Sequence, residues 1–138
     1  MKSVTIVSDD RVGLLADISY VLGKSNINID GLVVDVIGGR AVISMEVKDP
    51  KKAKEVLENN GYKTTNPEAI VIKTPANYME KINQILSLQK IQITESTTLS
   101  TDDRDTVVAI NVDKPRKAAK MLGNFLLGHN PARSSDSG

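Results

Sequence analysis

The chain has 138 residues, of which 40% are apolar and 25% charged, and its formal net charge is +1. This length and composition suit one ordinary domain or two small domains with packed cores. A nearly neutral chain with three tyrosines, one phenylalanine and no tryptophan lacks the charge and the stacking surfaces of nucleic-acid-binding modules. The absence of cysteine excludes disulfides and thiolate metal sites, and no apolar run reaches the roughly 18 residues of a membrane-spanning helix. We therefore expect a cytoplasmic protein without nucleic-acid or membrane partners.

The first half of the chain alternates strand-like and helix-like patterns. The predicted strands lie at 2–7, 27–37, 40–47 and 62–65, and the predicted helices at 12–24 and from Pro50 to about Asn59. The apolar phase of the second strand changes at Gly31, which predicts a β-bulge there. Gly38-Gly39 predicts a hairpin turn, and Asp49 before Pro50 predicts a capped helix start.

The second half of the chain repeats this order. The predicted strands lie at 69–73, 91–99 and 106–112, and the predicted helices run from Pro75 to about Ser87 and onward from Pro115. Pro50 and Pro115 are 65 positions apart, and so are Leu57 and Leu122. A constant offset across different elements indicates duplication. The segment 60–73 is expected to run as one long or bent strand shared by both sheets.

The pattern predicts an α+β protein of two tandem ferredoxin-like βαββαβ modules, each an antiparallel sheet with helices on one face. The first module spans 1–67 and the second 68–127, and a polar tail occupies 128–138. The second module lacks a clear last strand, because no apolar segment follows Leu127. Free sheet edges favour pairing with another copy, so a homodimer is expected.

A short turn joins the first predicted strand to the first helix, and its sequence is Asp9-Asp10-Arg11-Val12-Gly13-Leu14-Leu15. Backbone N–H groups at a helix N-terminus lack internal partners, and the helix dipole favours an anion there. The amides of residues 12–14 could hold the carboxylate of an amino acid, while Asp10 and the side-chain oxygen of Asn28 accept from its ammonium group. Gly13 would permit close approach. The alternative is plain helix capping by Asp10, with Arg11 solvated or paired with Asp9 or Asp35.

The segment DRVGLLADISYVLGKSNINI resembles the signature of the ACT domain, a small regulatory module in which a D-R-P-G-L-L-like turn precedes the first helix. Val12 stands where that pattern usually has proline, and Asn28-Ile29 matches the N-I step that opens the second strand. The resemblance implies a non-enzymatic regulator that binds an amino acid at a module interface and signals through assembly or a partner protein. The ligand-binding residues that it implies are Asp10, Arg11, Val12, Gly13, Leu14, Asn28 and Ile29.

The second module departs from the motif, since Tyr78 takes the place of Gly13 and Gln92 that of Asn28. We expect it to support pairing rather than binding, and a ligand-free dimerisation module is the alternative for the whole chain. The acidic run 102–105 lacks the glycine and the final glutamate of a calcium loop, which favours a solvated hairpin. His129 is the only histidine. No catalytic residue, metal site or cofactor is therefore predicted.

Overall fold

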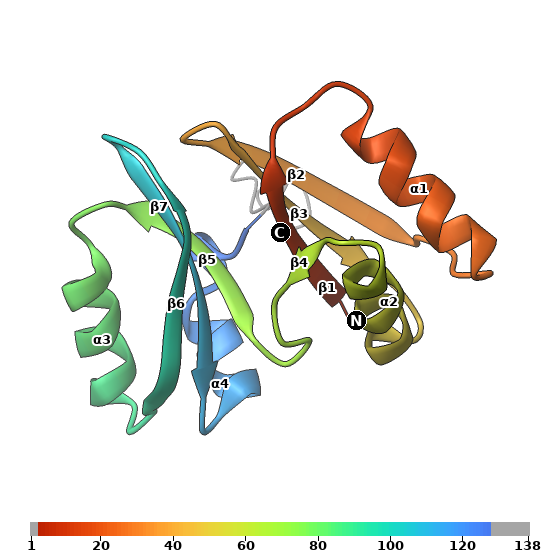
Figure 1. Cartoon of the computed structure of the whole chain (residues 1–138). Coiled ribbons are helices and arrows are strands. Elements are labelled where there is room, and N and C mark those ends of the chain that lie inside the picture. Colours follow the sequence, from red (N-terminus) through yellow and green to blue (C-terminus); the bar gives the residue numbers. More distant parts are fainter. Residues whose placement is uncertain (1–2, 128–138) are drawn as a thin grey trace, which may run out of the picture. The chain divides into compact units, whose positions relative to one another are not determined.

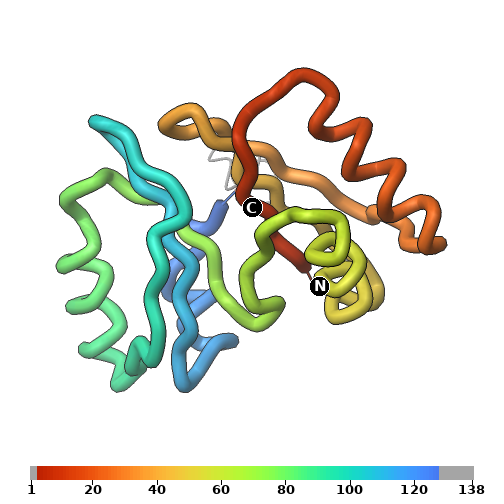
Figure 2. Tube along the Cα trace, in the orientation of Figure 1, coloured from red at the N-terminus to blue at the C-terminus, as the bar shows by residue number. Residues whose placement is uncertain are grey.

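The computed structural model describes residues 3–127, which form two compact units that divide between Pro67 and Glu68 (Figures 1 and 2). Each unit has an antiparallel sheet and its own helices, so the predicted α+β fold of two tandem ferredoxin-like modules is confirmed. The predicted polar tail at 128–138 lies outside the described residues. No helix among residues 3–127 is long and apolar enough to cross a membrane.

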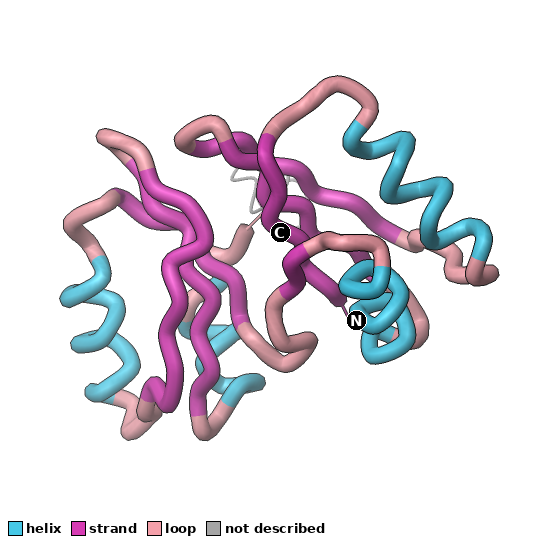
Figure 3. The backbone as a smooth tube through the Cα atoms, viewed as in Figure 1, coloured by secondary structure: helices cyan, strands magenta, loops and turns pink. Residues whose placement is uncertain are grey.

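Unit 1 follows the βαββαβ order. Its elements are β1 (Ser3–Asp9), α1 (Leu14–Lys24), β2 (Gly31–Ile37), β3 (Arg40–Glu46), α2 (Pro50–Asn59) and β4 (Lys63–Thr64). The strand order in the sheet is β2-β3-β1-β4, and every neighbouring pair is antiparallel (Figure 1). Figure 3 distinguishes the strands from the helices by colour. β2 and β4 are therefore the edge strands of this sheet.

The core of unit 1 forms where both helices pack on one face of the sheet. In β3, Ala41, Ile43 and Met45 are buried and alternate along the strand. Val4 and Ile6 of β1 join them, and the helices contribute Leu14, Ile18, Leu22, Ala53 and Leu57. The buried residues alternate along the strands and recur at helical spacing along α1. Both patterns place the apolar side chains on the faces that meet in one shared core.

The predicted bulge at Gly31 does not interrupt β2, because the strand begins at that residue. Just before it, the Asp30 amide donates at 2.8 Å to the carbonyl of Glu46, the residue that pairs with Gly31. Its register with β3 runs without a shift from Gly31 opposite Glu46 to Ile37 opposite Arg40. Ile27 and Ile29 precede the strand and pack, partly buried, against the core. The change of apolar phase therefore marks the boundary between a loop and a strand. The predicted glycine hairpin turn is present, with φ of 59° at Gly38 and 76° at Gly39.

The predicted cap of α2 is confirmed, since the Asp49 carboxylate accepts a hydrogen bond from the Lys52 amide at 3.1 Å. We expect Asp49→Ala to lower the free energy of unfolding by about 1 kcal/mol, because that amide loses its acceptor. Asp49→Asn keeps an acceptor oxygen and should lose less. Urea denaturation of both variants measures the difference. An equal loss in both would show that the charge, not the hydrogen bond, stabilises this helix end.

Unit 2 has three strands. Its elements are β5 (Ile70–Pro75), α3 (Met79–Leu88), β6 (Ile93–Thr101), β7 (Asp105–Val112), α4 (Pro115–Met121) and the 3₁₀ turn η1 (Gly123–Phe125). The strand order is β5-β7-β6. Where unit 1 has β4, the described part of unit 2 has a single antiparallel bridge between Ile72 and Leu126. The prediction that this module lacks a clear last strand is confirmed.

Three details of the second half differ from the sequence prediction. Pro75 ends β5 opposite Asp105 and does not open a helix, because proline suits a strand end as well as a first helical turn. The interval between the strands predicted at 91–99 and 106–112 shrinks to a turn, because β6 extends to Thr101 and β7 begins at Asp105. The segment 60–73 is not one shared strand: β4 pairs with β1, while β5 pairs with β7.

Candidate functional site

The turn before α1 ends at Gly13, which occupies the N-cap position with φ of 82°. This left-handed backbone conformation favours glycine. Space does not require glycine, because a Cβ added there would meet no atom within 4 Å. No side chain caps α1, so the alternative that Asp10 acts as the cap is wrong. Glycine is therefore needed here for its backbone conformation, and the space beside it is open.

The first turn of α1 leaves backbone donors unused. The Leu14 amide donates to the Arg11 carbonyl at 3.3 Å, and the Asp17 amide donates to the Gly13 carbonyl at 2.9 Å. Within residues 3–127, the amides of Gly13, Leu15 and Ala16 donate to no protein acceptor. Of the predicted amides of residues 12–14, only that of Leu14 is used, because it closes the turn itself, and the free donors extend beyond it to Leu15 and Ala16.

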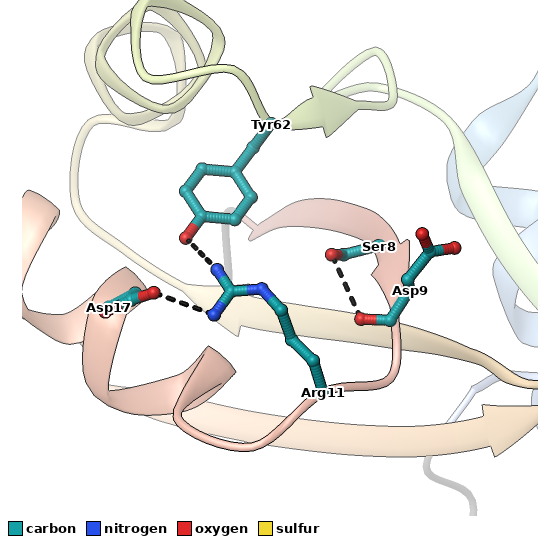
Figure 4. Close-up of polar contacts among 5 residues, drawn as sticks. All are labelled: Ser8, Asp9, Arg11, Asp17 and Tyr62. Atoms are coloured by element: carbon teal, nitrogen blue, oxygen red, sulfur yellow. Dashed lines mark hydrogen bonds and ion pairs between the residues drawn. The ribbon is translucent and has the colours of Figure 1, made fainter.

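Arg11 makes an ion pair within the turn region (Figure 4). Its Nη1 lies 2.8 Å from Asp17 Oδ2, and its Nη2 donates to the Tyr62 hydroxyl at 3.3 Å. The hydrogen bond with Asp17 is the main reason that the pKa of Arg11 is raised. The ion pair is thus with Asp17, rather than with the suggested Asp9 or Asp35. Arg11 is about half exposed, and its charge is already balanced.

A hollow of about 220 Å³ lies between this turn, the start of α1 and the helix-covered face of the sheet. Its lining residues are Asp10, Arg11, Gly13, Leu14, Leu15, Ala16, Val34, Ala41 and Ile43. Gly13, Leu15 and Ala16, whose amides are free, all belong to this lining. The hollow therefore combines main-chain donors and one carboxylate with an apolar floor.

The structure brings together four of the seven predicted ligand-binding residues: Asp10, Arg11, Gly13 and Leu14 all line the hollow. Val12 is fully exposed, at 100%, and does not line it. Asn28 and Ile29 follow the other end of α1, an 11-residue helix and so about 16 Å long (Figure 1). Within one copy, these two residues are therefore separated from the turn.

Five lining residues were not predicted, and they come from two sources. Leu15 and Ala16 belong to the first turn of the helix, whose amides the motif already indicated. Ala41, Ile43 and Val34 form the floor. The alternation of β3 placed Ala41 and Ile43 on one face, but the pairing of Val34 with Ile43 follows only from the register of β2.

The equivalent position of unit 2 is filled. Tyr78 is the N-cap of α3 and has φ of −101°, so this helix starts without the left-handed glycine. The Tyr78 ring centroid lies 5.7 Å from that of Phe125, and Lys81 Nζ lies 5.3 Å from the same tyrosine ring. Gln92 lines a separate hollow of about 280 Å³ beside α3 and β6. Tyr78 in place of Gly13 thus goes with a helix start that lacks the left-handed conformation.

The acidic run between β6 and β7 forms a tight turn. Asp102 Oδ1 accepts hydrogen bonds from the amides of Arg104 and Asp105, both at 2.8 Å. These hydrogen bonds, the one from Asp105 first, hold the pKa of Asp102 below its usual value. Among residues 3–127, no group of three or more acidic or histidine side chains is arranged to hold a metal ion.

Comparison with known proteins gives one family match and several structural likenesses. Residues 2–59 match the model of the ACT domain. Protein BT0572 from Bacteroides thetaiotaomicron is 22% identical over 89% of this chain and 86% of its own, with a TM-score of 0.49. The regulatory subunit of aspartate kinase from Thermus flavus is 17% identical over 89% of this chain and 90% of its own, with a TM-score of 0.48. No curated protein sequence matches the chain.

Proposed function

We propose, from the match of residues 2–59 to the model of the ACT domain, that the chain is a regulator rather than an enzyme. We propose that its first unit binds one amino acid in the hollow beside the turn. One observation supports this most directly. Three residues with free backbone N–H groups, Gly13, Leu15 and Ala16, line the same hollow as the Asp10 carboxylate.

The lining suggests how the two charged groups of an amino acid are held. The free amides at the start of α1 and the helix dipole suit the α-carboxylate. The Asp10 carboxylate suits the ammonium group. This arrangement requires both charges on one ligand, so neither a simple carboxylic acid nor a simple amine satisfies it.

The charges around the hollow favour a ligand with a neutral side chain. Asp17 balances Arg11, so the two carboxylates and one guanidinium of Asp10, Arg11 and Asp17 sum to −1. An acidic side chain would be repelled, whereas Val34 and Ile43 offer apolar contact. The volume of about 220 Å³ lies below the roughly 300–1,000 Å³ of pockets for drug-sized ligands, which suits a single amino acid.

Asn28 and Ile29 enter this proposal through a second copy. The resemblance to ACT domains implies that they act at a module interface, and within one copy α1 separates them from the turn. A ligand that contacts two copies binds the assembled state more tightly than the separate one. Binding would therefore shift assembly, or association with a regulated partner protein.

Calorimetric titration of the full chain with the twenty amino acids tests the proposal. We expect a neutral, apolar amino acid to bind, and aspartate and glutamate to bind at least about 10-fold more weakly. For leucine as the probe, the matched amine and the matched carboxylic acid should each lose most of the affinity. Asp10→Asn should weaken binding about 10-fold, because a charged hydrogen bond is lost.

Asp103→Asn is the matched control, since Asp103 lies in the β6–β7 turn of the other unit. It should leave affinity unchanged. Absence of binding by all twenty amino acids contradicts the proposal, and so does an equal effect of the two asparagine variants.

A ligand-free dimerisation module is the second candidate. The exposed apolar side chains on the edge strand β2 favour it, since they suit association without a ligand. This candidate predicts an oligomer whose mass and stability do not respond to any amino acid.

A further inference from the structure

One end of unit 2 gathers basic side chains from two neighbouring loops. The end of α3, the start of β6, the end of β7 and the start of α4 all lie at this end (Figure 1). The Gln92 amide donates to Asp113 Oδ1 at 2.9 Å, and the Asp113 amide donates to the Gln92 carbonyl at 3.1 Å, so the two loops are held together. Five exposed basic residues of these loops and of α4, together with Leu88, form a surface that we call the basic corner: Leu88, Lys90, Lys114, Arg116, Lys117 and Lys120.

The charge of the basic corner is not balanced within the unit. Its five cations and the neighbouring Asp113 carboxylate sum to +4. The β6–β7 turn, at the other end of the same hairpin, has three carboxylates and one guanidinium and sums to −2. Among residues 3–127, no carboxylate forms an ion pair with a cation of the corner.

The end of α3 accounts for two of these cations. Lys114 Nζ donates to the Lys90 carbonyl at 2.9 Å, and Lys117 Nζ donates to the Gln89 carbonyl at 3.2 Å. Cations are favourable beside the C-terminal end of a helix, so both lysines have a structural role. The charges of Lys90, Arg116 and Lys120 remain to be explained.

Unit 1 shows what the same helix end looks like without this surface. α1 ends with Lys24, and two residues later Asn26 has φ of 58°. At the matching places α3 ends with Leu88, which is 82% exposed, and Lys90 has φ of 59°. Asparagine tolerates this left-handed conformation better than lysine does. Unit 2 thus has an exposed apolar side chain and a less suitable residue where unit 1 follows the ordinary preferences of a helix end.

The start of α4 shows a similar departure. Asp49 caps α2 in unit 1, whereas Lys114, 65 positions later, is the N-cap of α4 and provides no side-chain cap. Its charge adds to those of Arg116 and Lys117 in a first turn without acidic residues, where the helix dipole opposes cations. Residues that break local preferences without stabilising the fold are expected at functional surfaces.

We infer that the basic corner binds an acidic segment of a partner protein, and that Leu88 contacts an apolar residue of that segment. Carboxylates of the partner balance cations that have no acidic partner among residues 3–127. The contact removes the exposed surface of Leu88 from water. A nucleic acid suits the corner less, because none of its residues is aromatic and could stack on a base. A membrane surface requires a broader apolar face than one leucine.

This inference rests on the proposed function in one respect, the regulated partner protein, and it assigns that partner to a surface of unit 2. The hollow beside Gly13 in unit 1 has no part in it. Peptide binding and amino-acid binding are therefore measured separately, and either can fail without the other.

Fluorescence anisotropy of the full chain with a labelled oligoglutamate peptide, carrying one leucine at its centre, tests the charges. Arg116→Glu should raise the dissociation constant about 10-fold, because an attraction becomes a repulsion. Glutamate suits the first turn of a helix, so this variant should keep its fold. Lys51→Glu is the matched control, because Lys51 lies 65 positions earlier at the same place in α2, and it should leave the dissociation constant unchanged.

Leu88→Ser tests the apolar contact. It should weaken the leucine-containing peptide about 5-fold and leave unchanged the affinity for the same peptide with serine at its centre. Absence of peptide binding, or equal weakening by Arg116→Glu and Lys51→Glu, would overturn the inference. Tighter binding of an oligothymidine or of phosphatidylserine vesicles, lost in Arg116→Glu, would overturn the assignment to an acidic protein segment. Calorimetry with amino acids would still judge the ligand site on its own.

Discussion

Leu86→Ala is expected to lower the free energy of unfolding of unit 2 by about 2–5 kcal/mol, while Leu88→Ala, two residues along the same helix, should change it by less than about 0.5 kcal/mol. Leu86 is fully buried, and Leu88 is 82% exposed. Leu86→Ala leaves a cavity in the core, whereas Leu88→Ala removes the same atoms from a side chain that is already exposed to water. The pair therefore measures core packing with helix propensity held constant.

The measurement should report on unit 2 itself, because a chain of two units can unfold in more than one step. Amide hydrogen exchange along β7, whose Val108 and Ile110 share the core cluster with Leu86, provides that signal. The amide hydrogens of these residues exchange when unit 2 unfolds, and their exchange rate should rise in Leu86→Ala only. A similar acceleration in both variants would mean that the side chain at 86 does not support this core as its burial indicates.

The elements that sequence analysis predicted well are those whose pattern is local. Helical spacing and glycine turns placed α1 and the β2–β3 hairpin, and the Asp49-Pro50 step placed the start of α2. The duplication offset of 65 positions also holds in the structure. Gly13 and Tyr78, related by this offset, are both N-cap residues, although only the first has a positive φ.

The errors arose where one residue type serves two structural purposes. Pro75 suits a strand end and a helix start equally, and only its pairing with Asp105 decides between them. Gly31 was interpreted as a bulge inside a longer strand because the apolar positions change phase there. In the structure Ile29 packs on the core from a loop, which no period-two pattern describes.

The candidate site was predicted only in part, because its apolar floor depends on long-range strand pairing. The turn and the helix start are consecutive in sequence, so Asp10 and Gly13 could be identified together. Val34 reaches the hollow through the register of β2 with β3. Arg11 finds Asp17 because the left-handed Gly13 sets the direction in which α1 leaves the turn.

Gly13→Tyr is expected to abolish amino-acid binding, whereas Gly61→Tyr should leave it intact. Both glycines have positive φ, 82° and 87°, and an added Cβ meets nothing within 4 Å at either position. Each substitution should therefore cost a similar amount of stability, about 1–2 kcal/mol, from backbone strain. Only residue 13 lines the hollow, so only there does the aromatic ring cover the free amides.

Thermal unfolding and calorimetry on the same preparations separate these two effects. Similar melting temperatures with loss of binding in Gly13→Tyr alone would support the site, and Gly13→Ala provides a smaller side chain if the tyrosine variant does not fold. The comparison is informative because the chain carries tyrosine at the matching start of α3, with φ of −101°. Unchanged affinity in a folded Gly13→Tyr variant would show that the ligand does not bind at the turn. A tyrosine ring at residue 13 and a carboxylate bound to the neighbouring amides cannot occupy the same space.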